Sequence, residues 1–232
     1  MPSLELDSYP AATTLRDAIA RRELGVEELL RATLARIDAL NPKVNAIVTL
    51  DAQAALATAR HMDKHGPQGE QVLFGLPIAV KDLALTRGIR TTFGSPLFAD
   101  FVPHEDDLFV SRLRAAGAII LGKTNTPEFG AGSQTFNRVF GATRNPYDLS
   151  RTCGGSSGGA AVALATGMTA LRCAIPPRSA MWSACDRRPA VCRAGRVSCR
   201  VKRWRCKGRW HAIQATVPCC CRPWPAPMRG CR

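Results

Sequence analysis

The spacing of apolar residues along the first 44 positions predicts two helices. The first carries Leu15, Ile19 and Leu24, and the second carries Val26, Leu29, Leu30, Leu34, Ile37 and Leu40. Both sets recur at the interval that places apolar side chains on one helix face. We expect Asn41-Pro42 to end the second helix, because a proline disfavours helical backbone in the residue before it.

The next segments predict a strand, a helix and a loop. The apolar and β-branched stretch "NAIVTL" favours a short strand. Asp51 follows it at a position where its carboxylate can cap an alanine-rich helix, which we expect to run to about Met62. Residues 64–71 read "KHGPQGEQ" and predict a polar loop.

Residues 75–124 alternate as in an α/β protein. The stretch "LPIAVK" predicts an interior strand that ends on Lys81, and "AIILGKTN" predicts a second buried strand. Between them lies a predicted helix, capped by Asp106 or Asp107 and closed by Gly117. This order predicts an α/β fold, a mixed β-sheet flanked by helices with further helices at the N-terminus.

The last part of this apolar pattern is an irregular stretch followed by a helix. Residues 130–152 are rich in Gly, Asn and Thr, and residues 157–167 predict a helix of small side chains. No apolar run approaches the roughly 18 residues that a membrane helix needs. The N-terminus lacks the basic and apolar segments of a secretory signal, so we expect a cytoplasmic protein with reduced cysteines.

The composition changes near residue 170. Residues 1–170 hold 17 basic and 17 acidic residues, so the formal charge of +14 belongs to residues 171–232. That tail contains a single acidic residue, Asp186, together with nine of the ten cysteines and all four tryptophans. We therefore expect one globular domain over residues 8–170, and a tail without a domain of its own, irregular or disordered, over residues 171–232.

Two functions could be assigned to the tail itself. Trp204 and Trp210 lie among Arg203, Arg205 and Arg209, a composition that suits binding to single-stranded nucleic acid. Four cysteines recur every seven residues: Cys185, Cys192, Cys199 and Cys206. Zinc-binding pairs are usually closer, so we predict no metal site. The prolines and the missing apolar periodicity argue against a folded module in the tail. Nucleic-acid binding therefore remains the alternative to an enzymatic function.

The stretch "TCGGSSGG" at residues 152–159 has several possible roles. A linker and a phosphate-binding loop fit it poorly, because an apolar helix follows at once and the GxxxxGK[ST] pattern is missing. The stretch also matches G-x-S-x-G, the nucleophile elbow. That motif needs an aspartate and a histidine further along the chain, and here they would be Asp186 and His211, both in the tail. A serine hydroxyl can also be activated by a desolvated lysine such as Lys81. The alternative for Lys81 is a strand-end ammonium group in solvent.

Four motifs resemble the amidase signature family over roughly residues 8–170. They are "GLPIAVKD", "GAIILGKTNTPEFG", "FGATRNPYD" and "CGGSSGGAAVALATG", and they occur in this order. The N-terminal stretch "ARIDALNPKVNAIVTL" is similar to that family too. The residues of the middle motifs are more similar to those of free amidases than to those of the amidotransferase subunit that makes ammonia for tRNA amidation. That subunit, a glutamine-hydrolysing relative, remains the alternative.

The resemblance implies hydrolysis of a small-molecule carboxamide to a carboxylate and ammonia or an amine. The family uses a Ser–cisSer–Lys triad, with no metal and no cofactor. By this resemblance Lys81 is the base, and Ser156, after a cis peptide bond, is the bridging residue that relays the proton. Ser157 lends its hydroxyl to the same network, and Gly155 and Gly158 relieve crowding around the turn.

The resemblance does not extend to the acylating serine. It should follow the bridging serine by 24 positions, but position 180 is Ala180, and Ser179 follows "PPR" instead of glycines. If residues 171–187 are written as G/C-rich codons and these are translated in a shifted frame, they can encode "SLRNPAAQRDVVGLRP". This sequence is similar to the family at and after its nucleophile. We therefore expect a chain truncated and frameshifted after about residue 170, catalytically defective, with exposed apolar strand edges and a tendency to aggregate.

Overall fold

The computed structural model describes residues 9–173, 205–206 and 209–210. The chain divides into two compact units, residues 1–191 and residues 192–232. In the second unit the described residues form two short strands, β9 (Arg205–Cys206) and β10 (Arg209–Trp210), which pair antiparallel. The other expectations for residues 174–232, including the nucleic-acid module and the frameshifted nucleophile segment, lie outside the described residues.

Three N-terminal helices form where the apolar pattern predicts them, but Leu24 lies beyond the first, which ends at Ala20. The third runs to His65 instead of about Met62. The helices are α1 (Ala12–Ala20), α2 (Val26–Val44) and α3 (Ala52–His65). The expected end at Asn41-Pro42 is wrong, because α2 continues through Pro42 to a left-handed cap at Asn45. The Asn41 side chain accepts hydrogen bonds from the backbone N–H groups of Ala46 and Ile47, and thereby fixes the turn that follows.

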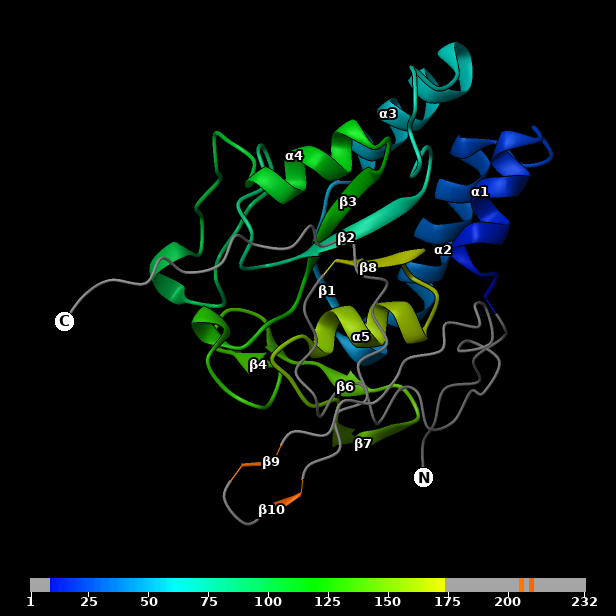
Figure 1. The fold of residues 1–232 in the computed structure, drawn as a ribbon. Coiled ribbons are helices and arrows are strands. Elements are labelled where there is room, and N and C mark those ends of the chain that lie inside the picture. Colours follow the sequence, from blue (N-terminus) through cyan, green and yellow to red (C-terminus); the bar gives the residue numbers. More distant parts are fainter. Residues whose placement is uncertain (1–8, 174–204, 207–208, 211–232) are drawn as a thin grey trace. The chain divides into compact units, whose positions relative to one another are not determined.

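Four strands form the central sheet, which is mixed as predicted, although the fourth lies past residue 170, where the domain was expected to end. They are β1 (Ile47–Leu50), β2 (Pro77–Lys81), β3 (Ile119–Thr124) and β8 (Leu171–Cys173), in the order β1-β3-β2-β8. β2 pairs in parallel with β3 and β8, whereas β1 pairs antiparallel with β3. Figure 1 shows β2 between its two parallel neighbours. This position makes Lys81 the last residue of an interior strand.

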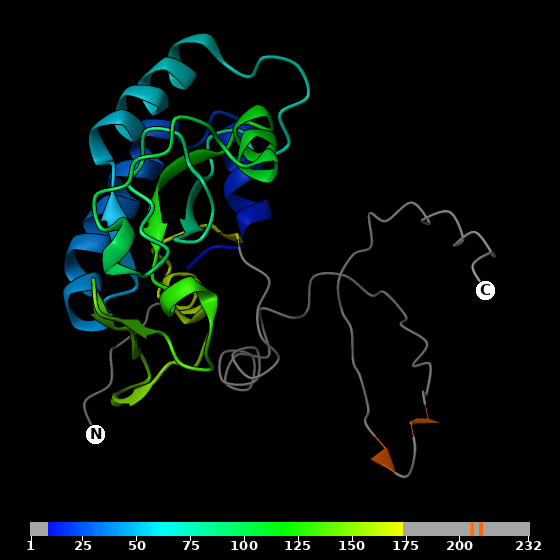
Figure 2. The same cartoon turned by 90° about the vertical axis from the view of Figure 1, so that its left-hand side faces the viewer.

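Helices pack on the sheet through two apolar clusters. The larger cluster joins side chains of α1, α2, α3 and the later helix α5 (Gly158–Ala165) to the sheet. The smaller cluster brings Val110 of α4 (Leu108–Ala115) against Val80 and Ile120. Figure 2 shows α2 and α3 (blue to cyan) on one side of the strands and α4 (green) on the other. Among the described residues, no helix combines the length and apolar character that a bilayer crossing requires.

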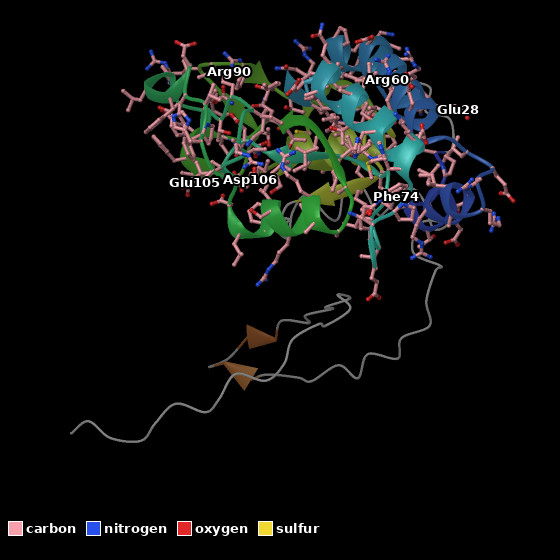
Figure 3. The ribbon with its side chains drawn as sticks, turned by 90° about the horizontal axis from the view of Figure 1, so that it is seen from above. Glu28, Arg60, Phe74, Arg90, Glu105 and Asp106 are labelled. Carbon is pink, nitrogen blue, oxygen red and sulfur yellow. The ribbon has the colours of Figure 1, made fainter. Side chains whose placement is uncertain are left out.

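The start of α4 differs from the prediction in its side-chain contacts. Asp107 is the N-cap residue, but its carboxylate makes no capping hydrogen bond. It accepts instead from the Leu85 backbone N–H at 2.8 Å, and Asp106 accepts from the Arg87 N–H at 2.7 Å. Figure 3 shows Glu105 and Asp106 together, well apart from Glu28 and Arg60 on the α2–α3 side of the molecule. The two aspartates therefore tie α4 to the loop after β2.

The segment 130–152 is more regular than its composition predicts. It contains two small antiparallel ladders, which pair β4 (Phe136–Asn137) with β5 (Gly141–Ala142) and β6 (Arg144–Asn145) with β7 (Asp148–Thr152). Each ladder is too short to produce a periodic apolar pattern in the sequence. The segment holds residues that contact the serine turn.

Candidate active site

The structure brings Lys81 and the serine turn together from distant parts of the chain. Lys81 ends β2, and Ser156 and Ser157 lie in the turn before α5. The Lys81 Nζ lies 3.0 Å from the Ser156 Oγ and 3.1 Å from the Ser157 Oγ. A lysine amine in hydrogen-bond contact with a hydroxyl is the arrangement in which it can take or return that proton.

The two serines differ in exposure. The peptide bond between Gly155 and Ser156 is cis. Ser156 is partly exposed, whereas Ser157 is completely buried. A molecule arriving from solvent would therefore meet the Ser156 hydroxyl before that of Ser157.

The surroundings of Lys81 favour its neutral form. Burial lowers the pKa of Lys81 from 10.5 to about 8. None of the six ion pairs found in the described part of the chain involves this lysine. Ser157 is also the N-cap residue of α5, and the partial positive charge at a helix N-terminus disfavours an ammonium group nearby. About a tenth of the amine is therefore unprotonated at pH 7, which is far more than in a solvated lysine.

Thr135 fastens the serine turn and was not singled out from the sequence. Its hydroxyl donates to the Gly154 carbonyl at 2.8 Å and accepts from the Gly158 N–H at 3.0 Å. Thr126 adds a weaker contact, because its hydroxyl lies 3.5 Å from the Ser156 carbonyl oxygen. No local pattern in "GSQTFN" indicates this role, since the contact joins residues 23 positions apart.

The glycines of the turn leave room that its neighbours occupy. A Cβ at Gly155 would lie 2.8 Å from the Gln134 carbonyl carbon, and one at Gly158 would overlap the Thr135 Oγ1 and the Cys153 Sγ. Cβ atoms essentially never approach other heavy atoms this closely. Gly155 and Gly158 are therefore needed for close packing of the turn against residues 134–135, in agreement with the space expected from the sequence.

Cys153 lies beside the turn but is not placed for chemistry. The side chain is buried and its thiol is free. Burial raises the pKa of Cys153 to about 11, and the Sγ donates to the Gly154 carbonyl at 3.3 Å. Because the thiolate is the reactive form, this residue is a packing element of the turn.

A buried amide network supports the same region. Asn125 follows β3, and its side-chain nitrogen donates to Gly141 and Thr143 at 3.1 and 3.0 Å. The Asn137 side chain donates to the Asn125 Oδ1 and to the Thr126 carbonyl, each at 2.7 Å. The network joins the end of β3 to the ladders of residues 136–145. It thereby fixes the backbone at Thr126, next to Ser156.

A second lysine lies on the neighbouring strand but faces the opposite side of the sheet. Lys123 of β3 pairs with Val80 in register, and Lys81 pairs with Thr124. Since successive strand residues point to opposite faces, the two lysines diverge. The Lys123 Nζ is completely buried and donates to the Ala84 carbonyl at 2.5 Å. Further bonds run to the hydroxyls of Thr86 and Thr91 at 3.0 and 2.9 Å.

The described residues hold no group of three or more His, Cys, Asp or Glu side chains that could bind a metal ion. The residues expected to form the site, Lys81, Gly155, Ser156, Ser157 and Gly158, lie together in the structure. Ser179 and Ala180 lie outside the described residues. The roles assigned to the site residues stay predictions.

Comparison with known protein families and curated proteins identifies clear relatives. The family model "Amidase" matches residues 28–174. The glutamyl-tRNA(Gln) amidotransferase A subunit of Solidesulfovibrio magneticus is 47% identical over 155 residues, which are 67% of this chain and 32% of the relative. That of Acidothermus cellulolyticus is 49% identical over 156 residues, 66% of this chain and 31% of the relative. The chain thus spans about a third of the curated relatives it matches.

Solved structures with similar folds include a hydrolase and an acylamidase. A 6-aminohexanoate cyclic dimer hydrolase in complex with its substrate matches with a TM-score of 0.63 and 34% identity, covering 69% of this chain and 32% of that one. A bacterial aryl acylamidase matches with a TM-score of 0.65 and 30% identity, covering 69% of this chain and 34% of that one. A chain of an inhibitor-bound complex that bears on the evolutionary origins of an s-triazine catabolic enzyme matches with 35% identity and a TM-score of 0.65, covering 69% of this chain and 36% of that one.

Proposed function

Because the chain belongs to the amidase signature family, we propose that its Lys81–Ser156 pair is the base and proton relay of a carboxamide hydrolase. The reaction converts an amide to a carboxylate and ammonia or an amine. The observation that carries the proposal is the position of the Lys81 Nζ, 3.0 Å from the Ser156 Oγ and 3.1 Å from the Ser157 Oγ. The pKa of about 8 lets this amine accept a proton near neutral pH.

Each residue of the turn has a defined part in the proposed relay. The neutral Lys81 amine takes the hydroxyl proton of Ser156, and Ser156 in turn takes the proton of an attacking serine. The second hydrogen bond of the Lys81 amine, to the Ser157 hydroxyl, holds the amine in place. Thr135 and Thr126 position the turn, because they bind its backbone and do not reach the amine.

We further propose that the chain, with the sequence printed here, is catalytically defective. The position that should carry the attacking serine is Ala180, and the family match ends at residue 174. Without that hydroxyl the relay has no proton to pass from a nucleophile. The nucleotide sequence from codon 165 onward tests the cause, since a shifted frame must continue with amidase-like sequence.

Restoring the missing part is the direct test of both statements. The purified chain should show no turnover on a panel of aliphatic and aromatic amides. A chimera of residues 1–173 with the remaining two thirds of the cyclic dimer hydrolase should hydrolyse that enzyme's substrate. Lys81→Ala and Ser156→Ala should each abolish this activity, whereas Lys64→Ala, an exposed helical lysine, should leave it unchanged.

Two results would contradict the proposal in different ways. If the chain alone turns over an amide and loses this activity with Lys81→Ala, the catalytic defect is refuted. If the chimera is folded and active but Lys81→Ala has no effect, the assignment of the base is refuted. The undivided cyclic dimer hydrolase serves as the positive control for the assay.

A glutamine-hydrolysing amidotransferase subunit is the second candidate. It is favoured by the 47–49% identity to curated A subunits, which exceeds the 34% identity to the cyclic dimer hydrolase. A second chimera, with the remaining two thirds of such an A subunit, separates the candidates. Release of ammonia from glutamine only in that chimera, with its partner subunits present, would favour the amidotransferase.

A further inference from the structure

Among the described residues, the Lys81 amine contacts hydroxyl groups and forms no ion pair. The residue is partly exposed and its Nζ contacts two hydroxyls. The neighbouring Asp82 carboxylate is buried and accepts the hydroxyl and N–H of Thr92. Lys123 faces the other side of the sheet, as its bonds to the loop after β2 show.

The remaining elements around the amine add no anion. α5 reads "GGAAVALA" and contains no ionisable side chain. Cys153 is the titratable group of the turn, and its raised pKa keeps it a neutral thiol. Amines with such surroundings are nucleophiles as well as bases, because their lone pair is free in the neutral form. In the described structure Lys81 therefore combines a lowered pKa with contact to a hydroxyl that can carry its proton.

We propose that Lys81 is a covalent acceptor for small activated acyl compounds, with acyl phosphates as the representative class. The Nζ lone pair attacks the carbonyl carbon, a C–N bond forms, and the bond from carbon to the phosphate oxygen breaks. Inorganic phosphate leaves with that electron pair and receives the proton lost by the amine, which the Ser156 hydroxyl can transfer. No oxidant or reductant is needed, and the product is a stable amide on Lys81.

This inference uses the same amine as the proposed hydrolase but does not require a nucleophilic serine or turnover. Ordinary amides would not react, because their nitrogen is a poor leaving group. The acyl group must be small, since the amine lies between β2 and the turn before α5 and half of it is covered. Acylation would remove the basic lone pair of Lys81, so an acylated chain could not carry out the proposed proton transfer.

Acetyl phosphate provides the test on the intact chain. The protein is treated with a limiting amount at several pH values, cleaved at its acidic residues, and its lysines are quantified by mass spectrometry. Lys43 and Lys64 are exposed and serve as internal controls. We expect Lys81 to react at least about tenfold faster at pH 7, because a pKa of about 8 leaves far more neutral amine than a solvated lysine has.

The pH profile and the type of bond complete the test. Labelling of Lys81 should reach half of its plateau rate near pH 8, and the label should resist neutral hydroxylamine, which cleaves esters but not amides. Unfolding in urea should abolish the preference for Lys81. Equal labelling of the three lysines in the folded chain would overturn the proposal, and so would a hydroxylamine-sensitive label on Ser156. Neither result depends on the activity of the chimeras.

Discussion

Lys81 and Lys123 lie on adjacent parallel strands, yet their surroundings give them opposite roles. Lys123 is completely buried and its Nζ contacts a carbonyl and two hydroxyls, in the loop that also holds the buried Asp82. Lys81 is partly exposed, and within the described part of the chain its Nζ bonds two serine hydroxyls. The first arrangement ties the loop after β2 to β3 and stabilises the fold there. The second arrangement leaves an amine that can exchange protons. The hydrogen-bond partners and the solvation of each lysine therefore decide its role.

Replacement of Lys123 should have the largest effect on stability. In Lys123→Met the Ala84 carbonyl and the Thr86 and Thr91 hydroxyls lose their shared donor inside the protein. We expect the free energy of unfolding to fall by about 3 kcal/mol, measured as the midpoint of urea unfolding. Lys64→Met on the exposed face of α3 should change it by less than about 0.5 kcal/mol. Equal midpoints for the two variants would show that the Lys123 network is not structural.

On the Lys81 side, the largest effect should come from closing the space at Gly158. A Cβ in Gly158→Ala would collide with Thr135 and Cys153, and overpacking of this kind costs about 1–3 kcal/mol. Gly25→Ala is the matched control, because its Cβ would meet only ordinary contacts at 3.6 Å and beyond. Urea unfolding measures both. If Gly158→Ala unfolds at the same midpoint as the control, the turn has more room than the structure indicates.

Loss of the Thr135 hydroxyl should weaken the turn by less. Thr135→Val removes the acceptor of the buried Gly158 N–H and the donor to the part-buried Gly154 carbonyl. We expect a loss of about 1–2 kcal/mol in the free energy of unfolding. The control is Thr58→Val, since Thr58 is exposed on α3 and bonds the carbonyl four residues earlier. In the chimera, Thr135→Val should also lower turnover, as expected for a positioning residue.

The smallest effect should have the opposite sign and depend on pH. The folded-state pKa of Lys81, about 8, lies below the ordinary 10.5. Between these values the unfolded chain binds more protons, so this lysine destabilises the fold fully below pH 8 and less as pH rises to about 10.5. After allowance for solvent screening, Lys81→Met should gain about 1 kcal/mol at pH 7.

The comparison of wild type and Lys81→Met at two pH values checks this sign. The difference between their urea midpoints should shrink toward zero at pH 10.5, whereas Lys64→Met should show no such trend. A Lys81→Met variant that is less stable than the wild type at pH 7 would contradict the lowered pKa of Lys81, because it would show that the fold stabilises the ammonium form.

Local sequence determined most of the elements. Period 3.6 placed α1 and α2, the Asp51 cap and the alanine-rich sequence placed α3, and the short apolar stretches placed β1, β2 and β3. The small residues after "CGGSSGG" gave α5, because only such side chains suit a helix that packs this closely. The end of α2 was predicted too early, since the helix runs through Pro42 to a left-handed cap at Asn45.

The sequence by itself determined which residues could do chemistry here, an interior lysine and a glycine-flanked serine pair, because these follow from residue type and neighbours along the chain. Tertiary structure decided which lysine meets the serines, since Lys81 and Ser156 are 75 positions apart and strand register alone turns Lys123 to the other face. It also decided that Thr135 holds the turn. Contacts at such separations depend on how the sheet, the ladders and α5 pack, and no local pattern records that packing.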